Sequence, residues 1–91
     1  MYCQKDFNKI DCTYFEVIQL TGYHILLKSK NTKHIWDIYI KETYSGKSSI
    51  VVMHKHNEAD PFHEQWNMHP KTVREAQWLI KDHDRWYLTN L

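Results

Sequence analysis

Four of the seven histidines in the chain lie between residues 51 and 70, in the stretch VVMHKHNEADPFHEQWNMHP. His54 and His56 are two positions apart, and residues with that spacing on a strand point to the same side, about 6.5 to 7 Å apart. Two imidazoles placed in this way can share one zinc ion at about 2.0 to 2.1 Å, and His63 from the following segment can provide a third ligand. The spacing therefore makes His54, His56 and His63 a candidate metal site with an open fourth position, at which a metal ion activates water.

The same segment also has a purely structural interpretation. If Val52 faces the core, His54 lies on the same side and forms hydrogen bonds at the edge of the core, while the two later histidines of the candidate site are solvated. His69 comes directly before Pro70, whose ring favours an extended conformation at the preceding residue. Because the histidine spacing matches none of the closed zinc sites, we expect no bound cofactor and keep zinc as the alternative.

Other catalytic patterns are absent from the sequence. Gly22 and Gly46 are isolated, so the chain has no glycine-rich phosphate loop, and no serine lies in the G-x-S-x-G context of a nucleophile elbow. Cys3 and Cys12 are two isolated cysteines that form no zinc knuckle. We therefore expect a protein that is not an enzyme and whose thiols are free.

The composition is typical of one folded domain, because 42% of the 91 residues are hydrophobic, 25% are charged, and only two are proline and two glycine. No apolar run approaches the roughly 20 residues of a membrane span. The amino terminus lacks the basic and then apolar profile of a signal peptide. These features predict a cytoplasmic protein without a membrane partner.

Alternation of apolar and polar residues predicts four β-strands. Their ranges are 13–20, 23–28, 35–42 and 49–54. The connections between them are short, which favours antiparallel pairing of neighbours in a meander. On the third strand Trp36, Ile38 and Ile40 share one face, and on the fourth strand Ile50 and Val52 do the same. We expect these five side chains to face the core.

A single helix is predicted over residues 72–84. Thr72 and Glu75 have the pattern of a capping box, in which the threonine hydroxyl accepts from a backbone N–H three residues on. An apolar stripe at helical spacing follows at Val73, Ala76, Leu79 and Ile80. The predicted fold is therefore α+β, a four-stranded antiparallel meander with one C-terminal helix packed on one face.

The predicted organisation along the chain is a single small domain over residues 1–91. Its parts are a mobile N-terminal segment at 1–12, the sheet at 13–56, a crossover loop at 57–71, the helix at 72–84, and a tail at 85–91. The tail is expected to form a short edge strand or to dock on the domain.

The sheet face opposite the helix mixes apolar, aromatic and basic residues, so we expect the first strand or a partner to cover it. Residues 23–56 carry six lysines against Asp37 and Glu42, and lysines contact phosphates while aromatic side chains stack on unpaired bases. A net charge of only +1 is low for a protein that binds double-stranded DNA. The predicted partner-binding residues are Lys28, Tyr39, Lys41, Met53 and Lys55 on this face, and Trp66 in the crossover.

We therefore expect a small, non-catalytic binding or regulatory module that engages a protein or a single-stranded nucleic acid. Ten lysines against two arginines are typical of low-GC bacteria and their phages, which suits an accessory protein of a phage or mobile element. One alternative is a zinc-type metal-binding protein that uses His54, His56 and His63. Another alternative is a homodimer formed through the sheet, with no other ligand.

Overall fold

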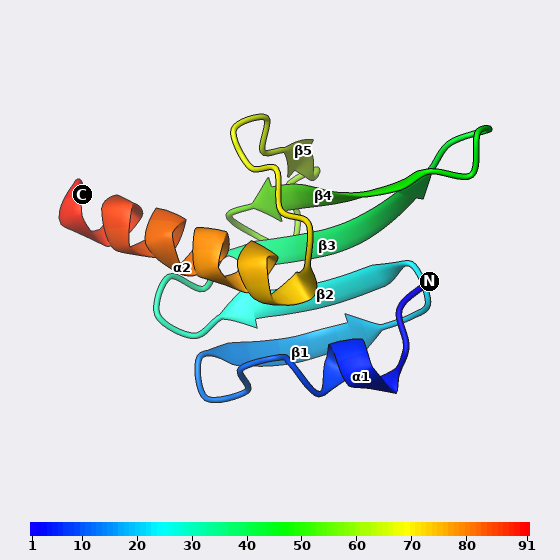
Figure 1. The fold of residues 1–91 in the computed structure, drawn as a ribbon. Helices are drawn as coiled ribbons and strands as arrows, with labels where there is room; N and C mark the ends of the chain where they lie inside the picture. The colour runs from blue at the N-terminus through cyan, green and yellow to red at the C-terminus, as the bar shows by residue number, and fades with distance from the viewer.

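The computed structural model describes residues 1–91 as one antiparallel sheet with helices on one face (Figure 1). The elements are α1 (Gln4–Phe7), β1 (Phe15–Leu20), β2 (His24–Ser29), β3 (Ile35–Glu42), β4 (Ser48–Lys55), β5 (His63–Glu64) and α2 (Val73–Thr89). The five strands lie in the sheet in the order in which they follow along the chain. The predicted α+β meander with a C-terminal helix is confirmed, with one strand more than the four expected.

The core lies between α2 and the central strands. Antiparallel pairing sets Ile38 of β3 between Ile25 of β2 and Val52 of β4, so these three side chains share the face that α2 covers. All three are fully buried, together with Ala76 and Ile80 of the helix. Alternation on the strands and an i, i+4 spacing on the helix thus bury one face of each element.

The fifth strand lies inside the segment predicted as a crossover loop. Its two residues pair with the end of β4, Met53 opposite Glu64 and His54 opposite His63. Two residues are too few for an alternation pattern, so the sequence gives no signal for this strand. The pairing nevertheless matters, because it brings His63 directly beside His54.

Helix α2 begins where the sequence predicts. The Thr72 hydroxyl accepts a hydrogen bond from the Glu75 backbone N–H at 3.0 Å. The predicted end at residue 84 and the predicted tail at 85–91 are wrong, because the helix continues to Thr89. Neither helix is long and apolar enough to span a bilayer.

The helix passes residue 84 because tertiary contacts stabilise the acidic side chain there. Asp84 is fully buried, and its carboxylate accepts hydrogen bonds from the Tyr14 hydroxyl at 2.6 Å and the Thr32 hydroxyl at 3.1 Å. These bonds offset the unfavourable interaction between a carboxylate and the C-terminal half of a helix.

The first twelve residues, expected to be mobile, contribute two side chains to the core. Tyr2 and Ile10 are buried, and the Tyr2 hydroxyl donates to the Ile38 carbonyl oxygen at 3.0 Å. Helix α1 lies between them along the chain, next to β1 (Figure 1).

Loss of the N-terminal cap of α2 should destabilise the fold measurably. Thr72→Ala removes the acceptor for the Glu75 N–H, and we expect a loss of about 1 kcal/mol in the free energy of unfolding. For a domain of this size that is a drop of about 4–8 °C in Tm, measured by circular dichroism. Lys71→Ala, at the exposed neighbouring position, is the control, and equal melting of the two variants would contradict the cap.

Candidate metal centre

Five histidines gather at one end of the sheet, next to the C-terminal half of α2. We call His34, His54, His56, His63 and His83 the histidine cluster. His54 is its centre, because its ring centroid lies 4.9 Å from that of His34, 5.1 Å from those of His56 and His83, and 5.2 Å from that of His63. The cluster joins residues from the β2–β3 turn, from β4 and the position just after it, from β5, and from α2.

Packing against aromatic rings fixes the two buried members. His54 is 1% exposed and stacks on Trp36, its partner across β3 and β4, with ring centroids 4.0 Å apart. His34 is 2% exposed, and the Tyr87 ring of α2 packs edge-on against it at 4.4 Å. The ring of the exposed His56 stacks on His34 at 4.0 Å. Two imidazoles are thus held rigidly and a third borders solvent.

A chain of hydrogen bonds orders the buried rings. The Gln65 amide nitrogen lies 2.9 Å from His54 Nδ1, so this ring nitrogen accepts the bond. The other ring nitrogen, His54 Nε2, then carries the proton and donates to His34 Nδ1 at 3.0 Å. The Gln65 backbone N–H donates to the Val52 carbonyl at 2.9 Å, which keeps its amide beside the cluster.

The buried imidazoles are neutral near pH 7. Burial, followed by repulsion from His34 and the other ring neighbours, lowers the pKa of His54 to about 3. Burial also lowers the pKa of His34 and of His83, although the charge of Asp84 opposes the change at both. A metal ion binds the neutral form of imidazole. Few protons therefore compete with a metal ion for His34 and His54 near pH 7.

One ring nitrogen each of His34, His54 and His56 lies within 4.8 Å of the other two. Two nitrogens bound to one tetrahedral ion at about 2.0 to 2.1 Å lie about 3.3 Å apart. The 3.0 Å separation of His54 Nε2 and His34 Nδ1 is already close to that value. Because His56 is exposed just after the end of β4, a rotation of its ring can complete a three-imidazole site.

The structure brings all three predicted metal ligands into the cluster, but it groups His34 with His54 and His56. His63 is exposed, and its Nε2 lies 3.4 Å from the Gln65 amide nitrogen. The sequence did contain a signal for His34. Alternation places His34 on the same face as Trp36. Antiparallel pairing of the third and fourth strands then places the start of the third strand beside His54 and His56 at the end of the fourth.

Five of the six predicted partner-binding residues share the sheet face that α2 leaves uncovered. They are Lys28, Tyr39, Lys41, Met53 and Lys55. Trp66 lies apart from them, 77% exposed between β5 and α2. The first strand does not cover this face, because β1 pairs beside β2 at the edge of the sheet.

The uncovered face has an acidic side chain at its centre. Asp37 is 8% exposed, and its Oδ2 lies 2.8 Å from His24 Nδ1. The His24 ring in turn stacks on Tyr39. The other carboxylate oxygen of Asp37 is buried without a hydrogen-bond partner, and burial raises the pKa of this carboxyl.

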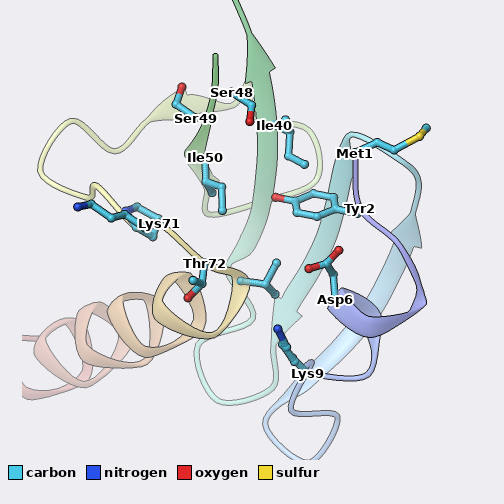
Figure 2. A pocket seen from close by; sticks show the side chains of 12 residues that line it. Met1, Tyr2, Asp6, Lys9, Ile40, Ser48, Ser49, Ile50, Lys71 and Thr72 are labelled. Atoms are coloured by element: carbon cyan, nitrogen blue, oxygen red, sulfur yellow. The ribbon is translucent and has the colours of Figure 1, made fainter. Parts of the chain in front are cut away.

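A separate pocket of about 460 Å³ lies at the opposite end of the sheet, where α2 begins (Figure 2). Figure 2 shows Tyr2 and Asp6 from the N-terminal segment on one side of it and Lys71 and Thr72 on the other. The lining contains two lysines and one aspartate but no histidine or cysteine. This pocket therefore lacks the imidazole and thiolate donors of the common zinc sites.

Comparison of the chain with known protein families, with curated proteins and with solved structures found no match. Its function is therefore inferred from the residues and their geometry.

Proposed function

We propose that this protein binds one divalent transition-metal ion through His34, His54 and His56. The convergence of three imidazole nitrogens within 4.8 Å supports the proposal. Nitrogen donors of this kind suit zinc, nickel and copper, whereas magnesium and calcium prefer oxygen ligands.

The cost of burying the cluster supports a role beyond packing. Polar groups are expensive to bury, and this end of the core holds two buried imidazoles, His34 and His54, beside Trp36. His83 Nδ1 is buried without any hydrogen-bond partner. A core selected for stability alone would gain from apolar residues at these positions, so the imidazoles are better explained as ligands and their supports.

Gln65 is the residue that would let His54 change from hydrogen-bond donor to metal ligand. Coordination through Nε2 requires that the His54 proton move to Nδ1, and Nδ1 then needs an acceptor. Rotation of the Gln65 amide by about 180° presents its oxygen at the same place, because amide oxygen and nitrogen are nearly the same size. A partner of this kind fixes the ring orientation of a ligating histidine.

Direct titration tests the proposed site. Isothermal calorimetry of chelator-treated protein with Zn²⁺ and Ni²⁺ should give one ion bound per chain. His56→Gln removes the exposed ligand and keeps both buried imidazoles in the chain, and we expect at least tenfold weaker binding. His69→Gln, at an exposed histidine outside the cluster, is the matched control. The proposal fails if no saturable binding is seen, or if the two variants bind alike.

Variants of Gln65 should separate support of a ligand from simple packing. We expect Gln65→Leu to weaken zinc binding about 10- to 100-fold, because His54 Nδ1–H then has no acceptor. Gln65→Glu should retain or strengthen binding, since a carboxylate accepts the same bond. The same calorimetry measures both, and unchanged affinity in Gln65→Leu would contradict this role.

A second candidate function is the binding of a protein partner on the uncovered sheet face, and Asp37 supports it. Its buried, unpaired oxygen is costly to the fold, and a carboxylate kept at such a cost indicates a constraint on this face other than stability. Light scattering at high concentration tests whether the partner is a second copy of the chain.

The cost of Asp37 can be measured directly. Burial raises its pKa, so its charged form destabilises the fold above that pKa and its protonated form does not. Asp37→Asn should therefore raise the free energy of unfolding at pH 7, on the order of 1 kcal/mol, as for other substitutions that relieve a functional constraint. The gain should vanish as pH falls toward 3 in urea titrations. A loss of stability at pH 7 would show that the carboxylate is structural.

A further inference from the structure

A pocket of about 330 Å³ adjoins the histidine cluster. Its walls include two of the three proposed ligands, His54 and the exposed His56, so the pocket borders the proposed metal site. Further polar side chains in the lining are His63, Gln65, His83, Tyr87 and Asn90. None of the lining side chains is an aspartate or glutamate.

No side chain that lines the pocket would compensate the charge of a bound ion. Three neutral imidazoles contribute no negative charge, and an ion with three protein ligands keeps an open fourth position. Asp84, the carboxylate whose charge acts on His34 and His83, is fully buried and held by the hydroxyls of Tyr14 and Thr32. Its carboxylate oxygens are therefore used in hydrogen bonds within the fold, and Asp84 does not line the pocket.

The polar groups around the pocket also favour an anion. The imidazoles of His63 and His83 and the amides of Gln65 and Asn90 each have N–H groups that can donate to an oxygen atom. Donors around a cation with an open position are the arrangement in which an oxyanion gains both coordination and hydrogen bonds.

We propose that this pocket takes a small oxyanion, a carboxylate or a phosphate, which completes the coordination of the metal ion. The inference rests on the proposed metal site. It goes further because it names the class of ligand at the fourth coordination position of the ion, an oxyanion that no lining side chain supplies.

The test uses the cobalt-loaded protein, because the visible absorption bands of Co²⁺ respond to its ligands. Acetate and inorganic phosphate are titrated separately, with acetamide as the uncharged counterpart of acetate. We expect saturable spectral changes with at least one anion and none with acetamide. A response to acetate alone identifies the carboxylate class, and a response to phosphate alone identifies the phosphate class.

A charge-placing variant locates the anion. Asn90→Asp adds a carboxylate to the pocket lining, and we expect it to weaken anion binding roughly tenfold or more through like-charge repulsion. Gln19→Glu, on the edge strand β1 at the other side of the sheet, makes the same change of net charge and should leave anion affinity unchanged. If cobalt binds but neither anion alters its spectrum, or the two variants weaken anion binding equally, the anion site is wrong while the metal site stands. If cobalt does not bind, both proposals fall.

Discussion

Zinc at a free concentration of about 100 times its Kd should raise the Tm of the metal-free protein by about 10–20 °C. Binding only to the folded state adds about 2.7 kcal/mol at that concentration. Each kcal/mol corresponds to about 4–8 °C in a domain of 60–100 residues. The shift is measured by circular dichroism melts of chelator-treated protein with and without zinc.

Controls separate the proposed site from scattered surface histidines. The double variant His34→Gln/His56→Gln removes two of the three ligands and should lose most of the shift, whereas His69→Gln should keep it. Magnesium should have no effect, because an all-imidazole site suits it poorly. A shift that survives in the double variant would place the metal elsewhere on the chain.

The fold could be predicted from the sequence where a strand buries one face and exposes the other. On β3 the alternation of Trp36, Ile38 and Ile40 with more polar neighbours marks the face that α2 covers, and the structure confirms it. The end of α2 could not be predicted. Acidic residues are unfavourable near the C-terminus of a helix, so those near position 84 indicate that the helix stops there and not that it continues to Thr89. Only the hydrogen bonds from Tyr14 and Thr32, 70 and 52 positions away in sequence, stabilise Asp84 there.

The candidate site could be predicted only in part, for the same reason. His54 and His56 are neighbours on one strand, so their spacing alone reveals them. His34 requires the register of β3 against β4, and His63 requires the two-residue strand β5. His83 enters only because α2 packs across this end of the sheet, and no local pattern contains that information.

Acidification of the metal-free protein from pH 7 to pH 4 should cost several kcal/mol of stability, and His54 accounts for much of it. Its pKa is about 3 in the folded state and 6.5 as a free side chain. Between these values the unfolded chain binds a proton at this residue and the folded chain does not, so the free energy of unfolding falls as pH falls. The slope is about 1.4 kcal/mol per pH unit, or about 3 kcal/mol in total by pH 4.

The groups around His54 act in the same direction. The rings that face it are those of His34, His56, His63 and His83, from every element packed around it. A proton on any of them would repel one on His54, whereas the opposing charge of Asp84 acts on His34 and His83. A total loss of this size is a large fraction of the roughly 5–15 kcal/mol that stabilises a typical domain.

Urea titrations between pH 7 and pH 4 measure the slope of the free energy of unfolding against pH. A substitution that changes stability equally at every pH leaves this slope unchanged, so comparing slopes isolates the effect of titration. His54→Gln retains a polar side chain that does not titrate, so its slope should be shallower than wild type by about 1.4 kcal/mol per pH unit. His69→Gln should follow wild type. Equal slopes in all three proteins would mean that His54 is protonated in the folded state, and then neither its burial against Trp36 nor its readiness to bind a metal would hold. Because a metal ion and a proton compete for the same ring nitrogens, zinc bound to the folded state keeps its ligands unprotonated, so zinc should leave the wild-type slope at least as steep above pH 5.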